Sequence, residues 1–188
     1  MEQPFFSISN YKISEQDYLT YLLYDSSKSK KAMTAKVINN ILFVIIMLSI
    51  LIYGNREGFN IEFTIIFSPL AITMFFVRRI MGRNLYHKKL ETYVKKNIKR
   101  RNNQNSDLLF FEKHIVVSEK ASEHKFFFNG IKEITEIKDI LFIKVLENNV
   151  LIINKMTTQN INILQKFLNG ISAENNISYS LDLEWKWN

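Results

Sequence analysis

Two long apolar runs around a short polar segment constrain the fold of this 188-residue chain more than any other feature. VINNILFVIIMLSILIY precedes and NIEFTIIFSPLAITMFFV follows the polar segment YGNREGF, residues 53–59. As helices the runs would be about 25 Å and about 28 Å long, close to the ~30 Å of a hydrocarbon core. Neither run has the polar stripe of a helix on a soluble surface. We therefore expect a two-helix transmembrane hairpin at residues 36–80.

The distribution of charge predicts how this hairpin is oriented. The chain has a net charge of +7, and basic residues flank the two apolar runs: Lys28, Lys30, Lys31 and Lys36 before the first, and Arg78, Arg79, Arg83, Lys88 and Lys89 after the second. The turn holds only Arg56 and Glu57. Basic residues favour the cytoplasmic side, so we expect both termini in the cytoplasm and the turn outside. Frequent Asn and Ile suggest a low-GC bacterium, and hence a multi-pass protein of its cytoplasmic (inner) membrane.

Three polar features within the apolar runs have a structural and a functional interpretation. Glu62 lies near the predicted outer boundary of the membrane. Its carboxylate is either solvated at the interface or a functional group inside the membrane. Asn39 and Asn40 lie near the predicted cytoplasmic boundary. Their side-chain amides are either solvated there or bind a partner helix. Pro69 is expected to kink the second helix.

Residues 1–35 are expected to form a cytoplasmic strand and helix. FFSISNY is read as the strand and SEQDYLTYLLYDSS as the helix, with Ser14 as the N-cap and Asp17 completing an imperfect capping box. Tyr18, Tyr21 and Leu22 would form the apolar face of this helix.

A basic amphipathic linker helix is expected at residues 81–105. Its apolar side would hold Tyr86, Leu90, Tyr93, Val94 and Ile98. Its basic cluster consists of Lys95, Lys96, Lys99, Arg100 and Arg101. Such a cluster is a solvated face or a site for anionic lipid headgroups, which attract each basic residue by about 1 kcal/mol. Nucleic acid is not an expected partner, because strands or helices that read bases are not apparent.

Residues 106–188 change to a period of two and predict an antiparallel sheet domain closed by one helix. LLFFEKHIVVSE is interpreted as one strand, followed by the short strands HKFFF, KEITEIK, ILFIKVL and VLIIN. TTQNINILQKFLNG is interpreted as the closing helix, capped by Thr157 or Thr158 and ended by Gly170. The whole chain is therefore an α+β protein with a membrane hairpin.

The end of the chain, ISYSLDLEWKW, alternates strictly and predicts one more strand. We select one face of it as a candidate partner-binding strand: Tyr179, Leu181, Leu183, Trp185 and Trp187. This strand would pair with an edge of the same domain or with another chain.

The residues that could support catalysis are few. His114 and His124 flank a predicted hairpin without a cluster of acidic ligands, and His87 lies in the basic helix. The chain has no cysteine and no glycine-rich phosphate loop or nucleophile motif. We therefore expect neither an enzyme nor a cofactor or metal site.

The order of these elements resembles the YcxB-like family of bacterial membrane proteins. The residues that carry the likeness are ISEQDYLTYLLY, FFEKHIVVSEKASEHKFFFNGIKEITEIKDILFIKV and IINKMTTQNINILQKFL. The family commonly has a tryptophan where this chain has Phe128, and it ends soon after the closing helix. The resemblance implies a cytoplasmic pleckstrin-homology-like (PH-like) domain on a two-helix anchor.

Two functions are consistent with these features. The first is a binding module, anchored in the lipid bilayer, that holds a protein or lipid partner at the cytoplasmic membrane face. The alternative is an immunity or self-protection protein that blocks a membrane-active bacterial toxin. A transport role would require a homo-oligomer, because two helices alone form no pathway.

Overall fold

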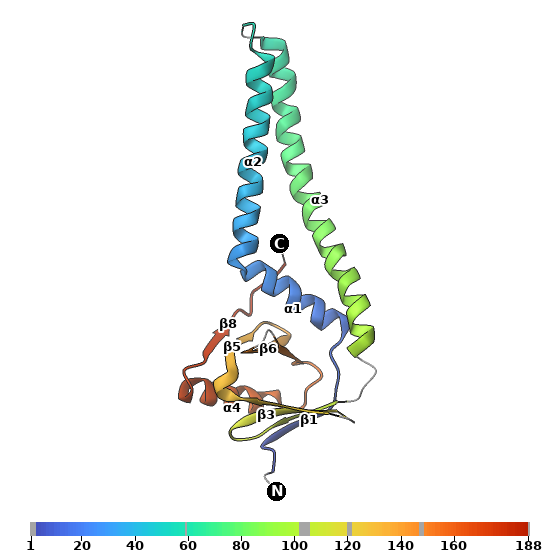
Figure 1. The fold of residues 1–188 in the computed structure, drawn as a ribbon, viewed down its shortest axis with the longest axis vertical. Helices are drawn as coiled ribbons and strands as arrows, with labels where there is room; N and C mark the ends of the chain where they lie inside the picture. Colours follow the sequence, from blue (N-terminus) through green and yellow to red (C-terminus); the bar gives the residue numbers. More distant parts are fainter. Residues whose placement is uncertain (1–2, 59, 102–105, 120–121, 147–148, 188) are drawn as a thin grey trace. The chain divides into compact units, whose positions relative to one another are not determined.

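The computed structural model describes residues 3–58, 60–101, 106–119, 122–146 and 149–187, without the side chains of residues 99–101. The chain divides into two compact units. Met1–Tyr21 and Tyr93–Asn188 form the first, here called the sheet unit; Leu22–Thr92 form the second, called the hairpin unit. Figure 1 labels the four described α-helices and several of the strands.

Two four-stranded sheets form the sheet unit. The first has the order β1-β2-β3-β4, with bounds Phe6–Tyr11, Ser106–Phe110, His114–Glu119 and Glu123–Phe127. The second has the order β7-β6-β5-β8, with bounds Val150–Asn154, Ile140–Val145, Ile131–Glu136 and Ser178–Leu181. Neighbouring strands are antiparallel except β5 and β8, which are parallel. The expectation of an α+β fold with antiparallel sheets and two long apolar helices is thus confirmed.

The first strand joins the same unit as the C-terminal half of the chain. Phe6 pairs with Phe110 and Ile8 with Leu108, so β1 is the edge strand of the first sheet. The division expected from the sequence separated residues 1–35 from residues 106–188. It did not foresee this pairing, because the register of β1 depends on a strand that lies far away in the sequence.

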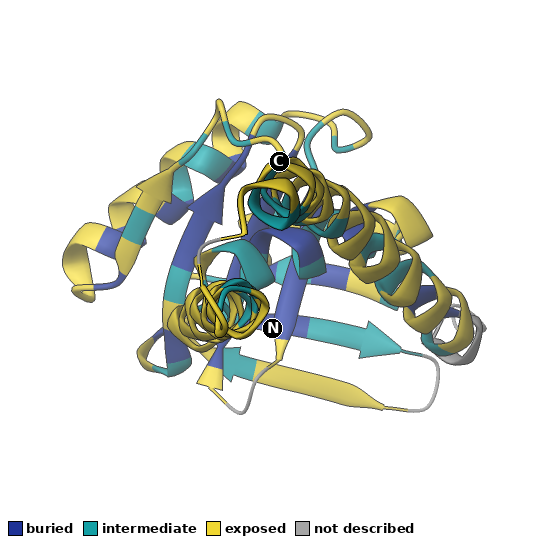
Figure 2. Cartoon of the chain, turned by 90° about the horizontal axis from the view of Figure 1, so that it is seen from above, coloured by how far each residue is buried: buried dark blue, intermediate teal, exposed yellow. Residues whose placement is uncertain are grey.

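The core of the sheet unit follows the period of two along its strands. Ile134, Leu141 and Ile143 are fully buried and come from the second sheet. Leu108, Phe110 and Ile115 are fully buried and come from the first. These side chains belong to one hydrophobic cluster. Figure 2 shows dark blue, buried residues gathered on the strands.

Helix α4, Ile161–Glu174, supplies the remaining part of this core. Leu164, Leu168 and Ile171 are buried, at the spacing of one helical face. The predicted cap and end of this helix are wrong. Its N-cap is Asn160, in a left-handed conformation with φ of 55°, and the helix continues past Gly170 because Ile171 still belongs to the buried face. Thr157 and Thr158 instead donate their hydroxyls to the carbonyl of Asn154.

The predicted single strand LLFFEKHIVVSE is also wrong. It is divided into β2 and β3 by a tight turn, in which the amide of Phe111 donates to the carbonyl of His114 at 2.9 Å. The turn folds the apolar residues of both strands back against one another, and Leu109 pairs with Val116. The strands expected at HKFFF, KEITEIK, ILFIKVL and VLIIN are confirmed as β4, β5, β6 and β7.

Helix α1, Glu15–Lys28, begins as predicted, since the amide of Asp17 donates to the Ser14 hydroxyl at 3.0 Å. Its predicted apolar face is rotated by about one residue. Leu19, Leu23 and Tyr24 are buried, whereas Tyr18, Tyr21 and Leu22 are only partly buried.

Two long helices make up most of the hairpin unit: α2, Lys30–Gly54, and α3, Ile61–Arg101. The Ser29 hydroxyl caps α2 by accepting from the amide of Ala32 at 3.4 Å. Helix α3 is continuous for 41 residues and passes through Pro69, so the expected linker helix is its last part.

Candidate functional site

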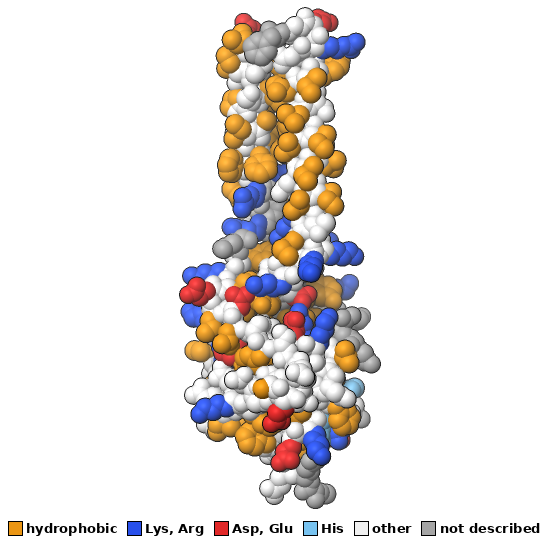
Figure 3. Space-filling model, turned by 90° about the vertical axis from the view of Figure 1, so that its left-hand side faces the viewer, with side chains coloured by type: hydrophobic (Ala, Val, Ile, Leu, Met, Phe, Trp, Pro, Cys, Tyr) orange, Lys and Arg blue, Asp and Glu red, His pale blue; other side chains and the backbone are white. Residues whose placement is uncertain are grey.

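The surface of the hairpin unit is apolar over most of its length. Helices α2 and α3 are the two described helices long and apolar enough to cross a membrane, with mean hydropathies of 2.3 and 1.6. None of the residues in these apolar windows is buried. Figure 3 shows hydrophobic side chains along the hairpin, with lysine and arginine side chains mainly away from the turn, although acidic and basic side chains also lie beside it. Soluble monomers rarely expose a continuous apolar surface of this size, so the hairpin is a candidate membrane-contact surface.

The turn of the hairpin is held by asparagine side chains. The Asn55 side-chain amide donates to the carbonyl of Leu51 at 2.9 Å and to the Thr64 hydroxyl at 3.4 Å. The side-chain oxygen of Asn55, Oδ1, accepts from the backbone amide of Asn60 at 2.7 Å. Asn60 in turn caps α3 by accepting from the amide of Phe63 at 3.0 Å. Asn55 and Asn60 thus bond the turn to both helices; Phe59, the last residue of YGNREGF, lies outside the described residues.

A second set of contacts joins the two helices far from the turn. The Arg78 guanidinium donates to the carbonyl of Asn39 at 3.1 Å and lies 4.7 Å from the centre of the Phe43 ring. Phe43 also contacts Phe75, with ring centroids 6.1 Å apart. Asn39 thus makes this contact with its backbone, not with the side-chain amide considered from the sequence. Glu62 is exposed in the first turn of α3.

The predicted headgroup cluster lies on the last turns of α3. Lys95 and Lys96 are exposed, while Val94 and Ile98 are buried. The side chains of Lys99, Arg100 and Arg101 lie outside the described residues. The expected apolar side of this helix is therefore narrower than predicted, because Tyr86 and Tyr93 are exposed.

The predicted partner strand is only partly a strand. Tyr179 and Leu181 lie in β8, which pairs with β5 of the same chain through Ile134 and Glu136. Leu183 lies in a turn that Trp185 closes, since the amide of Trp185 donates to the carbonyl of Asp182 at 3.1 Å, and Trp187 follows this turn outside any strand. The strand expected as far as Trp187 therefore ends at Leu181, because β5 offers no partner beyond Glu136.

The two candidate histidines lie on neighbouring strands but at opposite ends. His114 pairs with Phe127 and His124 pairs with Val117. His114 is buried and stacks on Phe111, with ring centroids 4.7 Å apart, whereas His124 is exposed. In the part of the chain that the structure describes, no three His, Cys, Asp or Glu side chains are grouped as metal ligands.

A buried carboxylate connects four elements of the sheet unit. Glu136, at the end of β5, is 6% exposed. Its Oε1 accepts from Lys155 Nζ at 2.8 Å and from Gln165 Nε2 at 2.6 Å. Its Oε2 accepts from the Tyr179 hydroxyl at 3.0 Å. Burial, then the charge of Glu136 and then this hydrogen bond raise the pKa of Tyr179 above its ordinary value of 10.0. Both oxygens of the buried carboxylate therefore have partners, which gives Glu136 a structural role.

An open cleft of about 880 Å³ lies in the sheet unit. Residues 124–127 of β4 line it, together with Asn149 and with Val150 and Leu151 of β7. Tyr11 from the end of β1 and Tyr93 from α3 also line it. The volume is within the range of about 300–1,000 Å³ that ligand sites have. Sequence reasoning missed this cleft; the only local signal is FFF at residues 126–128, where apolar residues break the alternation.

Comparisons with known proteins give no relatives: no family model, curated protein or solved structure matches the chain. The resemblance to YcxB-like proteins and the PH-like fold therefore stay predictions.

Proposed function

We propose that this protein is a membrane-anchored binding module, in which α2 and α3 cross a bilayer and the sheet unit holds a partner. The observation that carries the proposal is the exposed apolar surface of two adjacent helices. Each apolar side chain is worth about 1.5–3 kcal/mol when it leaves water, so a bilayer stabilises such a surface strongly. The contacts made by Arg78 and Asn55 hold the two helices together as one hairpin.

The orientation follows from the charges at the two ends of the hairpin. Basic residues border the apolar stretches on the side away from the turn: Lys30, Lys31 and Lys36 in the first turns of α2, and Arg78, Arg79 and Arg83 within α3. The positive-inside rule then directs the turn outward and both flanking segments to the cytoplasmic face of a bacterial inner membrane. The partner, protein or lipid, would be bound at that face.

A binding role, rather than catalysis, is consistent with how the buried polar groups are used. Asp17 accepts from the Asn154 side-chain amide at 2.9 Å, and Glu136 accepts from Lys155, Gln165 and Tyr179. Both carboxylates are therefore engaged in joining elements of the sheet unit.

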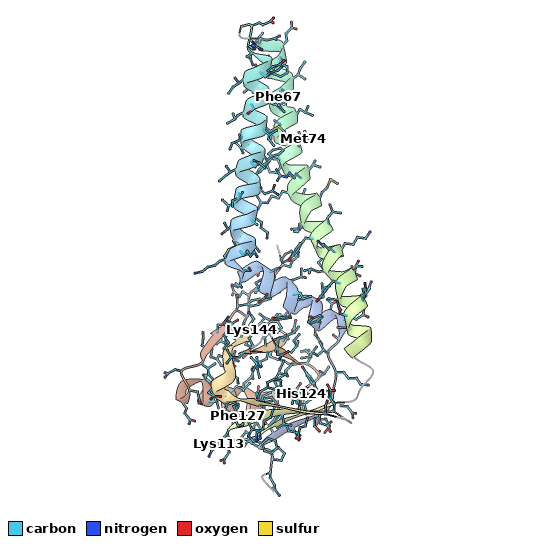
Figure 4. All side chains as sticks on the ribbon, in the orientation of Figure 1. Phe67, Met74, Lys113, His124, Phe127 and Lys144 are labelled. Atoms are coloured by element: carbon cyan, nitrogen blue, oxygen red, sulfur yellow. The ribbon has the colours of Figure 1, made fainter. Side chains whose placement is uncertain are left out.

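Thiol labelling tests the anchor and its orientation, because the chain has no cysteine of its own. Arg56→Cys places one thiol in the turn, and Lys113→Cys places one in the sheet unit (Figure 4). In intact bacterial spheroplasts, a membrane-impermeant maleimide should label Arg56→Cys directly and Lys113→Cys only after permeabilisation. Release of the chain by alkaline carbonate would overturn the anchor. Labelling of Lys113→Cys in intact spheroplasts would overturn the orientation.

A further inference from the structure

Strand β4 has one edge that no described strand covers. It is the last strand of the order β1-β2-β3-β4. The amide of Glu119 donates to the carbonyl of Ser122 at 2.8 Å, and the amide of Phe128 donates to the carbonyl of Lys113 at 3.4 Å. Bonded residues alternate in an antiparallel pair, so the even-numbered residues of β4 face β3. The backbone N–H and C=O groups of Glu123, Lys125 and Phe127 therefore point to the opposite edge.

This edge faces the cleft. Four consecutive residues, 124–127, line the cleft, although successive side chains of a strand point to opposite faces. A cleft can contact all four only if it runs along the edge of the strand. Figure 4 labels His124 and Phe127 on this strand.

Strand β7, which contributes Val150 and Leu151 to the cleft, has part of its outer edge bonded by a side chain. In β7, the carbonyl of Ile152 accepts from the Tyr11 hydroxyl at 3.1 Å, and the amide of Ile152 donates to the same oxygen at 3.0 Å. Tyr11 thus occupies the polar groups of β7 at this position. Strand β4 lines the cleft with four consecutive residues and offers outward backbone groups at Lys125 and Phe127.

The side chains around this edge favour an acidic, extended occupant. Among the described lining residues, Lys12, His124 and Lys125 stand against one carboxylate, that of Glu119. Apolar contact is available as well, because Phe127 and Leu146 are 54% and 58% exposed. A second copy paired antiparallel about Lys125 would place two lysines opposite each other, which is unfavourable.

We propose that the edge of β4 binds an extended acidic segment of a partner protein, which joins the first sheet as a fifth strand. Main-chain hydrogen bonds to Lys125 and Phe127 would give affinity, and an acidic side chain beside Lys125 would give specificity. This inference rests on the proposed function, because it names the partner class of the binding module.

The test uses the full chain in lipid nanodiscs and a fluorescein-labelled probe peptide, Val-Thr-Val-Glu-Val-Thr-Val. Fluorescence anisotropy measures binding, and amide hydrogen exchange by NMR measures protection along β4. We expect binding, with at least about tenfold slower exchange at the Lys125 and Phe127 amides, equivalent to about 1.4 kcal/mol. The His124 and Phe126 amides already face β3, so their exchange should not change.

Two variants separate backbone pairing from charge. Lys125→Pro removes an outward N–H without removing a bond to β3, so it should abolish binding and keep the fold. Lys125→Glu should weaken binding of the probe about tenfold and favour the same peptide with lysine at its centre. Lys138→Glu, exposed and away from the cleft, is the matched control and should bind as the wild type does.

Four results would overturn the proposal. One is the absence of probe binding to the wild type, and another is equal binding of a probe N-methylated at alternate residues. The third is protection of Lys125 and Phe127 that rises with protein concentration without the probe, which would identify a second copy as the occupant. The last is the same protection by phosphatidylserine vesicles alone, which would identify a lipid. None of these results affects the carbonate extraction and thiol labelling, which test the anchor separately.

Discussion

The Tyr11 hydroxyl both donates to the carbonyl and accepts from the amide of Ile152, a residue 141 positions away in the sequence. One phenol therefore replaces a neighbouring strand at this point of the β7 edge. It also anchors the end of β1, which pairs with β2, to the second sheet.

Replacing Tyr11 with phenylalanine should destabilise the sheet unit. Tyr11→Phe leaves the amide and carbonyl of Ile152 without their partner, at a cost of about 1–3 kcal/mol in the free energy of unfolding. Urea unfolding of the full chain in detergent micelles, monitored by far-UV circular dichroism, measures this change in the free energy of unfolding. Tyr53→Phe, at a 74% exposed position of the hairpin unit, is the matched control and should change nothing. Equal stability of both variants would show that this contact does not join the sheets.

Removing the charge of Glu136 should lower the free energy of unfolding more than Tyr11→Phe does. Glu136→Gln leaves the mostly buried Lys155 ammonium without its counter-ion, and breaking such a pair costs about 3–5 kcal/mol. Glu133→Gln is the matched control on the same strand. Its ion pair with Lys144 is more exposed, at 35% and 22%, and should be worth at most about 1 kcal/mol. Chemical unfolding of the two variants should separate them clearly, and similar losses would contradict the structural role of Glu136.

Alkaline pH should destabilise the sheet unit through Tyr179. Its pKa is raised in the folded state by burial, then by the charge of Glu136 and by their hydrogen bond. A raised pKa means that the folded state holds the Tyr179 proton more tightly than the unfolded state does. The stability that this provides is fully present below the unfolded pKa of 10.0 and is lost as the pH rises from there toward the pKa of the folded state. The free energy of unfolding should fall more steeply above about pH 10 in the wild type than in Tyr179→Phe. Parallel pH profiles would contradict this prediction.

A methyl group at Gly54 should disturb the hairpin. A Cβ at this position would overlap the Phe63 ring, whereas a Cβ at Gly82 would meet no neighbour within 4 Å. Gly54→Ala should therefore slow the disulfide crosslinking of cysteines placed at Phe43 and Phe75 about fivefold, the effect of roughly 1 kcal/mol. Gly82→Ala is the control and should crosslink at the original rate. Restoration of the rate by Gly54→Ala combined with Phe63→Ala would confirm the cause, and its absence would contradict it.

The features that could be predicted from the sequence are those that depend on neighbouring residues alone. The apolar runs are long enough to form helices α2 and α3 whatever surrounds them, and Ser14 caps α1 through the amide of Asp17, three residues away. The positions of β4, β5, β6 and β7 likewise follow from alternating side chains between short turns. In each case a local pattern is sufficient, because the interactions that produce the structure lie within a few residues.

The end of the chain shows where a local pattern is not sufficient. Residues 178–187 alternate throughout, yet β8 ends at Leu181. A strand needs a partner, and β5 ends at Glu136, whose carbonyl accepts a last bond from the amide of Asp182 at 2.8 Å. The alternating pattern thus predicts an extended strand, but it contains no information about the length of the neighbouring strand.

The sequence by itself determined the two apolar helices, the polar turn between them and most of the strands, because period and composition are local properties. Only the tertiary structure decided that β1 joins β2, that Tyr11 reaches Ile152, and that Glu136 is buried among Lys155, Gln165 and Tyr179. It also decided which edge of β4 faces a cleft. These features join residues from opposite ends of the chain, so they depend on sheet order and register, which no single segment encodes.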